Sequence, residues 1–381
     1  MSYKLVGDIE TWNTTIESCM NILIGFFNDN AKSGGAEGIL RQVAEFYLRR
    51  GDEVHLLFLQ QKQYGHWEEN NQDNLHLYYG GGAFRRIGNI KKLKKTEFDY
   101  SYSSIIRVTG PLGLMKRLGF LRIKTMVGRE STSIFTRYKG WRLRYYQMWY
   151  RLGYKAVDLL ICQTSYMKRQ LLNHQPWLQK NSLVVVIPNP VDVALMEEKG
   201  SQDIDLKALK PFVVTAGRFI PEKAYDVLLK AFALLMVRKP EMKLVVLGDG
   251  SLRGQIERQI IDLGLSEHVF LQGQVENVYP WFKAADLCVV SSRLEGFPNV
   301  LLQMMSQNER VVSTLCAGDI DKIAGLVTCE TDNADALEGA MIKAMEADVK
   351  GIRETFDSEL ESRRIEKFVE RVEALKLDNI V

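Results

Sequence analysis

Two cations stand close together just after a predicted strand, in TAGRFIPEK at residues 215–223. Gly217 ends the strand, and Arg218 and Lys223 follow at the mouth of the next predicted helix. The planar guanidinium of an arginine can bind two phosphate oxygens, and a lysine adds a compact positive charge. The spacing therefore suits a diphosphate, with a pair of solvated surface charges as the alternative interpretation.

A single carboxylate follows another apolar run in SSRLEGFPNVLLQMMSQ, residues 291–307. Pro298 is expected in the first turn of a helix, where its missing N–H leaves no bond unmade. Gln303 follows Glu295 by eight residues, about two helical turns. A carboxylate and an amide so placed could bind the hydroxyls of a sugar and of a ribose, or Glu295 could simply balance the helix dipole. The other residues that this turn would bring to such a ligand are Gly296, Phe297 and Asn299.

A glycine-rich turn, SGGAEG at residues 33–38, separates the first predicted strand from the first predicted helix. Gly34 and Gly35 would let backbone N–H groups approach an anion, and the helix N-terminus adds positive potential. The turn is not a G-x-G-x-x-G fingerprint, and no acidic residue is placed to bind a ribose as in a dehydrogenase. By itself it is weak support for an anion site.

These candidates all lie where short apolar runs end, and the runs alternate with helical patterns. Continuous apolar runs are typical of parallel strands covered on both faces. The repeated strand–helix pattern predicts doubly wound α/β domains, whose ligands bind beyond the carboxyl ends of the strands. The strands expected in the first half are Ile22–Phe26, Val54–Leu59, Ser103–Val108, Thr125–Val127, Leu159–Gln163 and Val184–Ile187. Those expected in the second half are Phe212–Ala216, Lys243–Leu247, Val269–Leu271, Leu287–Ser291 and Arg310–Ser313.

The break between the two series is IPNPVD, residues 187–192, where two prolines interrupt the pattern. We expect a first Rossmann-like domain at residues 20–190, joined by a C-terminal helix at about 359–381, and a second at 191–358. The cleft between two such domains is the expected binding site. Residues 1–19 have neither a long apolar segment nor a cleavage-site pattern, so we expect an N-terminal extension and not a signal peptide.

Composition and charge narrow the class of protein. The 381 residues are 46% hydrophobic and 25% charged, and no apolar run reaches the roughly 18 residues of a spanning helix. The five cysteines are scattered without a C-x-x-C pair, which argues against a zinc site and for a reduced, cytoplasmic protein. Residues 85–155 hold 18 lysines and arginines against three acids, a charge of +15 that leaves −12 for the rest of a chain whose total is +3. This uneven distribution of charge suggests that one face of the protein binds an anionic partner.

The motifs taken together resemble the retaining glycosyltransferases of family 4, which have the α/β GT-B fold of two Rossmann-like, doubly wound parallel-sheet domains facing a cleft. The resemblance covers about residues 20–369 and is stronger in the second half than in the first. The stretches that carry it are GGAE, VIPNPVD, GRFIPEKAYDVLLKAF, LGDGSLRGQIE, VYPWFKAADLCVVSSRLEGFPNVLLQMM and CAGDI.

The resemblance implies a metal-independent, retaining enzyme that takes its sugar from a nucleotide sugar, with a UDP-sugar expected and GDP left open. Arg218 and Lys223 would hold the diphosphate, and Glu295 would contact the donor sugar. No cofactor is implied, because the nucleotide sugar is a substrate and its departing phosphate can itself accept the proton of the acceptor hydroxyl. The donor-binding residues would be Gly34, Gly35, Gly217, Gly296, Phe297, Pro298, Asn299 and Gln303.

The sequence departs from the family pattern at three places. Gln303 replaces the second glutamate of the Glu-x7-Glu motif, and Ala224 replaces a glycine, a mild change if its φ is negative. The first-domain histidine is missing, and the stretch GRESTS puts Arg129 or Glu130 where the acceptor or the sugar would be positioned. Two alternatives therefore stay open: a nucleotide-sugar epimerase on the same fold, and a non-catalytic homologue that binds nucleotide sugar.

The acceptor side is expected in the basic region at residues 85–155, where cations are interleaved with Trp, Tyr, Phe and Leu. Such a surface suits an anionic membrane and a lipid-linked saccharide acceptor. We therefore expect a cytoplasmic enzyme of polysaccharide or glycolipid synthesis, peripheral on the inner face of the plasma membrane. No nucleic-acid motif occurs, so nucleic acid is not an expected partner. Ordinary helices with buried aromatics and solvated cations are the alternative interpretation of this region.

Overall fold

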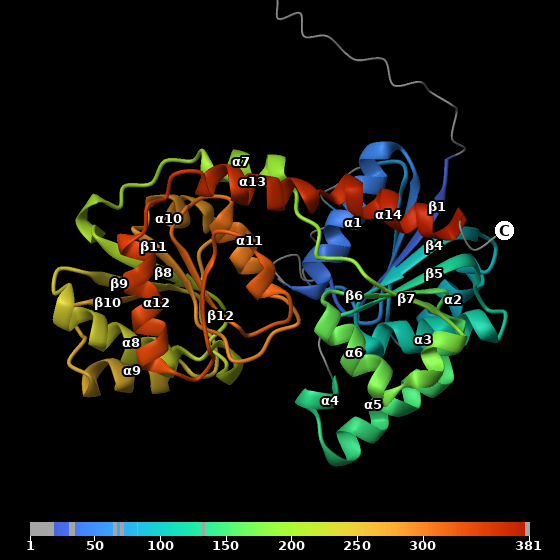
Figure 1. The fold of residues 1–381 in the computed structure, drawn as a ribbon. Helices are drawn as coiled ribbons and strands as arrows, with labels where there is room; N and C mark the ends of the chain where they lie inside the picture. The colour runs from blue at the N-terminus through green and yellow to red at the C-terminus, as the bar shows by residue number, and fades with distance from the viewer. Residues whose placement is uncertain are drawn as a thin grey trace, which may run out of the picture.

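The computed structural model describes residues 19–29, 35–63, 67–68, 72–81, 83–131 and 134–377. Within these residues the chain forms two lobes side by side, each a parallel sheet with helices packed on its faces (Figure 1). Gly34 and, apart from Cys19, the N-terminal extension expected at residues 1–19 lie outside the described residues.

The first domain is built on a seven-stranded parallel sheet with the strand order β3-β2-β1-β4-β5-β6-β7 among the described residues. The order reverses between β1 and β4, the kind of point at which α/β sheets bind ligands. The strands are β1 Asn21–Phe26, β2 Glu53–Phe58, β3 Leu75–Tyr79, β4 Glu97–Ser103, β5 Arg122–Glu130, β6 Leu159–Cys162 and β7 Leu183–Val186. The helices are α1 Ala36–Arg50, α2 Ala83–Leu93, α3 Ile106–Arg117, α4 Ile134–Arg137, α5 Gly140–Gly153 and α6 Ser165–His174.

The second domain has a six-stranded parallel sheet with the order β10-β9-β8-β11-β12-β13, and its order reverses between β8 and β11. The strands are β8 Phe212–Ala216, β9 Lys243–Leu247, β10 Val269–Gly273, β11 Leu287–Val290, β12 Val311–Thr314 and β13 Val327–Cys329. The helices are α7 Val193–Gly200, α8 Tyr225–Arg238, α9 Arg253–Asp262, α10 Tyr279–Ala284, α11 Asn299–Met305, α12 Ala334–Glu346 and α13 Ile352–Ser362. Apolar helix faces cover both faces of this sheet, which explains its continuously apolar strands.

One predicted strand, Ser103–Val108, was placed wrongly. The strand is β4, which ends at Ser103, and helix α3 begins at Ile106. Ile106 and Val108, two of the apolar residues behind this prediction, are buried in the first turn of α3, so their hydrophobicity belongs to a buried helix face and not to a strand. The true strand, EFDYSYS, looks polar in sequence, but Tyr100 and Tyr102 are buried within the core.

Helix α5 sits directly on α3 because both helices carry glycine where they cross. A Cβ atom on Gly153 would lie 2.0 Å from the carbonyl oxygen of Gly110, and one on Gly113 would lie 2.2 Å from the carbonyl oxygen of Gly153. No side chain fits between these backbones, so the glycines hold α5 at a fixed place on the first domain.

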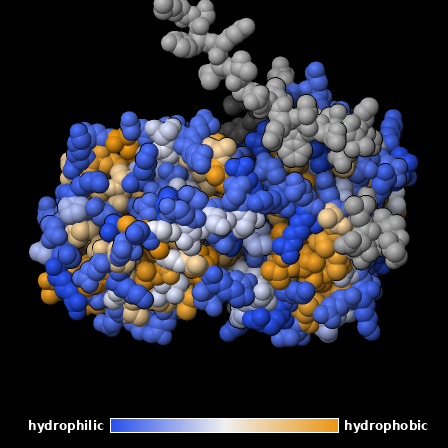
Figure 2. Space-filling model, turned by 45° about the horizontal axis from the view of Figure 1, so that its top comes forward, coloured by the Kyte–Doolittle hydropathy of each residue, from blue (hydrophilic) through white to orange (hydrophobic). Residues whose placement is uncertain are grey.

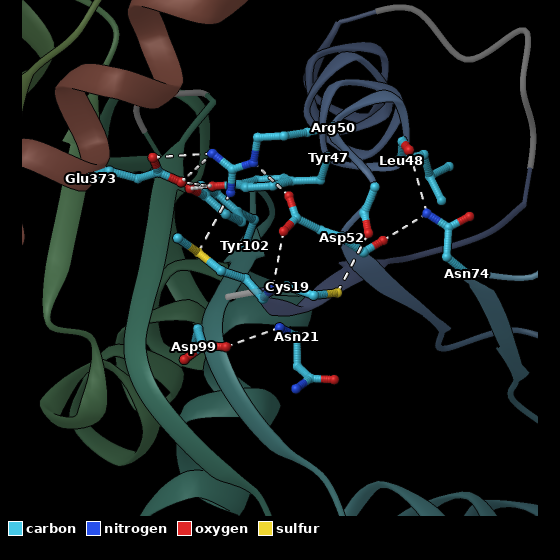
Figure 3. Close-up of polar contacts among 12 residues, drawn as sticks. Cys19, Asn21, Tyr47, Leu48, Arg50, Asp52, Asn74, Asp99, Tyr102 and Glu373 are labelled. Atoms are coloured by element: carbon cyan, nitrogen blue, oxygen red, sulfur yellow. Dashed lines mark hydrogen bonds and ion pairs between the residues drawn. The ribbon is translucent and has the colours of Figure 1, made fainter. Parts of the chain in front are cut away.

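The C-terminal segment crosses from the second domain to the first. Helix α13 packs on the second domain, and α14 (Ile365–Leu377) enters the core of the first domain beside α1. The one helix predicted at about 359–381 is therefore two helices, separated at residues 363–364. Figure 3 shows Glu373 of α14 reaching α1, where it pairs with Arg50 at 3.1 Å and accepts a hydrogen bond from Tyr47 Oη at 3.2 Å.

The surface is largely polar. On the face shown in Figure 2, hydrophilic side chains predominate and apolar side chains gather in separate patches on both domains. Among the described residues, no helix is both long enough and apolar enough to span a bilayer.

Candidate functional site

Strands β8 and β11 are neighbours at the reversal point of the second sheet, and their ends carry the motifs that the sequence singled out. Strand β8 runs into Gly217 and Arg218, and β11 runs into the turn that holds Glu295. A small cavity of about 10 Å³ opens between the two strand ends. It is lined by Thr215, Ala216, Lys223, Tyr225, Val290, Ser291, Ser292 and Val300.

A cation and a carboxylate from the two motifs meet at this point. Lys223 Nζ lies 2.7 Å from Glu295 Oε1, and the two side chains are only 17% and 20% exposed. Ser292 Oγ donates to the same carboxylate oxygen at 3.0 Å. The Glu295 N–H donates to the Cys316 carbonyl at 2.8 Å, which anchors the turn to the end of β12. Lys223 and Glu295 were predicted from separate motifs, and the fold makes them a pair.

Arg218 differs from Lys223 in having no such partner. Its side chain is exposed, and no ion pair joins it to another residue in the described part of the chain. The backbone before it is fixed, because Tyr225 Oη donates to the Gly217 carbonyl at 2.9 Å. A Cβ atom on Gly248 would lie 2.0 Å from that same oxygen, so the two glycine turns are in tight contact. Arg218 therefore stands on a backbone that is held in place, and its exposed guanidinium is available to bind an anion.

The turn between Lys223 and α8 is more strained than the sequence suggested. Ala224 is buried and adopts the left-handed conformation, with φ 53° and ψ 41°. The condition for a mild replacement, a negative φ, is not met. An alanine in this region costs on the order of 1 kcal/mol compared with glycine.

Arg293 braces the same turn, and sequence reasoning missed it. Its N–H donates to the Glu222 carbonyl and its Nη1 to the Pro221 carbonyl, both at 2.8 Å. Its Nη2 also pairs with Asp226 at 2.6 Å. Arg293 thereby holds the segment that carries Lys223 against the turn that carries Glu295. The sequence offered one signal for Arg293, because it lies in the same motif as Glu295. A single cation in a polar turn is, however, usually taken to be solvated.

Helix α11 begins at Asn299, so Pro298 stands just before the helix and not in its first turn as predicted. Phe297 is buried, with the guanidinium of Arg363 4.8 Å from its ring centre. Gln303 Nε2 donates to Tyr279 Oη at 3.3 Å.

The first domain touches the Glu295 turn directly. A Cβ atom on Gly296 would lie 2.3 Å from the Ser131 carbonyl oxygen, beyond the end of β5. Gly35, at the start of α1, accepts a hydrogen bond from Asn299 Nδ2 at 3.5 Å. Arg137 of α4 pairs across the domains with Glu222 at 3.0 Å. The site therefore lies where the two domains meet.

Arg129 and Glu130 end β5, and both side chains are buried. Arg129 donates to Ser104 Oγ at 2.8 Å and to Asn189 Oδ1. Glu130 Oε2 accepts a hydrogen bond from Tyr150 Oη at 2.8 Å. Burial lowers the pKa of Arg129 to about 10, an effect that the charge of Glu130 partly offsets. Burial raises the pKa of Glu130 to about 7, and the hydrogen bond from Tyr150 opposes this.

Glu130→Gln should change how stability depends on pH. The folded-state pKa of Glu130 lies at about 7, above its ordinary value of 4.5, so the wild-type chain loses stability as pH rises between these values. Glutamine removes this loss. The free energy of unfolding of the variant minus that of the wild type should therefore rise by about 3 kcal/mol between pH 4.5 and pH 8. Urea unfolding at pH 4.5, 6 and 8 measures it, and a difference that stays constant with pH would contradict it.

Comparison with known proteins places the chain. A family model described as Glycosyltransferase Family 4 matches residues 33–195, and one described as Glycosyl transferases group 1 matches residues 210–347. The lipopolysaccharide core biosynthesis glycosyltransferase LpsE of Rhizobium meliloti is 30% identical over 169 residues, which are 44% of this chain and 47% of that protein. The N-acetylgalactosamine-N,N'-diacetylbacillosaminyl-diphospho-undecaprenol 4-alpha-N-acetylgalactosaminyltransferase of Campylobacter jejuni is 33% identical over 129 residues, 34% of each chain. The aligned chain thus spans less than half the length of both relatives.

The likeness of fold extends over both domains. The crystal structure of HepE from Anabaena, in complex with UDP and glucose, superposes with a TM-score of 0.74 at 18% identity. It covers 94% of this chain and 100% of that one, so the two share the GT-B fold. The chain belongs to the family 4 glycosyltransferases, also described as group 1.

Proposed function

We propose that this glycosyltransferase moves a sugar from a nucleoside-diphosphate sugar, with UDP the expected nucleotide, to a hydroxyl of a lipid-linked saccharide. The observation that carries the donor half is the meeting of Lys223 and Glu295 at the reversal point of the second sheet. On the adjoining turn, Arg218 has no ion-pair partner among the residues that the structure describes. A relative that acts on a diphospho-undecaprenol-linked substrate, and a structural neighbour that binds UDP and glucose, agree with both halves.

Charge at the site accounts for departure of the nucleotide. Arg218 and Lys223 would hold the diphosphate and stabilise the negative charge that grows on it as the sugar leaves. Glu295 would accept hydrogen bonds from the sugar hydroxyls. A bound donor separates the Lys223–Glu295 pair, because Lys223 then pairs with phosphate and Glu295 with sugar. Two fixed cations supply the charge that a metal ion supplies in other transferases, so we propose transfer without a metal.

The other donor contacts would come from both sides of the cleft. From the second domain we propose Gly217, Gly296, Phe297, Pro298, Asn299 and Gln303, and from the first domain the turn at Gly35. On the first-domain side, we propose that Arg129 and Glu130 help to position the acceptor or the sugar. Both side chains are buried, so they would act by holding the residues around them.

Retention of configuration follows in this proposal from proton transfer to the departing phosphate on the face where the acceptor attacks. The test is an NMR assay in which the anomeric coupling of the product is compared with that of the donor, with and without a chelator. An axial donor that yields an axial product, at an unchanged rate under chelation, supports the proposal. An inverted product, or a rate abolished by the chelator, contradicts it. Release of an epimerised free sugar nucleotide would instead identify an epimerase.

The acceptor half of the proposal depends on the outer face of α5. Trp141, Tyr145, Met148 and Leu152 follow a spacing of four, three and four residues, which puts them on one helix face, and all four are exposed. Arginines at 142, 144 and 151 flank them and are also exposed. Apolar side chains rimmed by cations suit the interface of an anionic bilayer. We propose that this face places the first domain on the inner surface of the plasma membrane.

Trp141→Ser combined with Met148→Ser should weaken binding to anionic lipid vesicles by about tenfold, because two large apolar side chains no longer enter the interface. Sedimentation with vesicles of phosphatidylglycerol and phosphatidylcholine measures it. The matched control is Val237→Ser, which removes an 83% exposed apolar side chain from α8 of the second domain and should change nothing. Equal vesicle binding by the wild type, the double variant and Val237→Ser would contradict the proposal that α5 contacts the membrane.

A further inference from the structure

The link between the domains is stiff at one particular residue. Asn189 lies between two prolines, and a proline fixes its own φ and restricts the residue before it to extended conformations. Two residues later, the Val191 N–H donates to the Arg363 carbonyl at 2.9 Å, and the Ile365 N–H donates back to the Val191 carbonyl at 3.2 Å. The two passages of the chain between the domains therefore run side by side and hold each other.

The side chain of Asn189 joins both domains at this crossing. Its oxygen accepts a hydrogen bond from Arg129 Nη2 of the first domain. Its nitrogen donates to Asn299 Oδ1 of the second domain at 2.5 Å and to Gln163 Oε1 of the first at 3.3 Å. The residue is only 2% exposed, and both N–H bonds and the oxygen of the amide are used.

The first-domain end of this chain of bonds is a buried cation. Arg129 is 4% exposed, and its described hydrogen-bond partners are the neutral oxygens of Ser104 and Asn189. A charged donor makes a strong hydrogen bond, and removing its acceptor leaves a buried charge without a partner. Arg129 therefore fixes the orientation of the Asn189 amide.

The second-domain end is the helix that follows the Glu295 turn. Asn299 is the first residue of α11 and lies four residues beyond Glu295. The same turn rests on the first domain at Gly296, whose added Cβ would lie 2.3 Å from the Ser131 carbonyl. A substitution at Asn189 would therefore disturb the Glu295 turn in two ways: through the lost hydrogen bond to Asn299 and through the packing of Gly296 on Ser131.

We infer that Asn189 is a positioning residue for the transfer reaction, an inference that rests on the proposed function. It fixes the position of the first domain, which would carry the acceptor, relative to the Glu295 turn, which would orient the donor sugar. Arg218 and Lys223, the proposed diphosphate ligands, lie within the second domain, so Asn189 should act on turnover and leave nucleotide binding nearly unchanged.

Two substitutions remove different numbers of the Asn189 hydrogen bonds. Asn189→Ala removes all three bonds, whereas Asn189→Asp keeps the acceptor for Arg129 and removes the donors to Asn299 and Gln163. Both should lower kcat by about 10- to 100-fold, since a small misplacement of reacting groups has an effect of this size. KM for the nucleotide sugar and Kd for the nucleotide should change less than threefold. The matched control is Asn74→Ala, which removes an amide that donates to the Leu48 and Asp52 carbonyls within the first domain.

The outcomes distinguish this inference from the proposed function. Hydrogen exchange on the nucleotide-free proteins should be at least fivefold faster in residues 127–131 and 295–302 of Asn189→Ala than in the wild type or Asn74→Ala. Exchange that matches the control in both segments overturns the inference, whether or not the wild type turns over. So does a kcat equal to that of Asn74→Ala. A wild type with no transfer and no nucleotide binding contradicts the proposed function alone, and the exchange result still decides the role of Asn189.

Discussion

Arg218→Ala is expected to lower kcat/KM for the nucleotide sugar by roughly 100- to 1,000-fold, equivalent to about 3–4 kcal/mol of transition-state binding. The guanidinium is unpaired in the described structure and stands on a backbone fixed at Gly217. A diphosphate bound there gains two charge-assisted hydrogen bonds that strengthen as charge develops on the leaving group. Steady-state release of the nucleotide measures the effect.

Two further variants show whether geometry or charge is responsible. Arg218→Lys keeps the charge but loses the planar fork, so its activity should lie between those of the wild type and Arg218→Ala. Arg238→Ala removes an exposed cation of α8 whose partner is Glu338, and it should keep wild-type activity. Activity of Arg218→Ala within threefold of the wild type would show that this guanidinium does not meet the diphosphate.

Gly153→Ala is expected to lower the free energy of unfolding of the first domain by about 3 kcal/mol. The new methyl carbon would lie 2.0 Å from the Gly110 carbonyl oxygen, and a backbone atom cannot move aside as a flexible side chain can. Helix α5 must therefore shift on α3. Chemical denaturation followed by tryptophan fluorescence measures the loss, and binding to anionic vesicles should fall with it, because α5 carries the exposed face.

The matched control is Gly339→Ala within α12, where an added Cβ meets nothing within 4 Å. At this exposed helical position alanine should stabilise by about 0.5–1 kcal/mol. Equal effects of the two substitutions would mean that the helices do not cross as closely as the structure has them.

The second domain could be predicted well from sequence because its strands are short, apolar and separated by clear helical faces. The predicted runs Phe212–Ala216 and Lys243–Leu247 coincide with β8 and β9. In the first domain the same reasoning misplaced β4, because tyrosines and serines form a buried strand there. Hydrophobicity alone does not show that a tyrosine ring is buried while its hydroxyl is hydrogen bonded.

The residues of the candidate site also divide into those that the sequence could predict and those that it could not. Arg218, Lys223 and Glu295 could be singled out because unusual residue types follow strand ends. Arg293 and Asn189 could not, because their roles depend on contacts between segments far apart in the chain. The strain at Ala224 was also hidden, since a backbone angle is not visible in an alanine.

The most direct test of the central claim, a nucleotide-sugar site built on Arg218, Lys223 and Glu295, is calorimetric titration of the folded protein with UDP, GDP and ADP, repeated with Arg218→Ala. The account predicts micromolar binding of one nucleotide, expected to be UDP, that Arg218→Ala abolishes. Failure of a folded wild-type sample to bind any of the three, or binding that Arg218→Ala leaves unchanged, would contradict it.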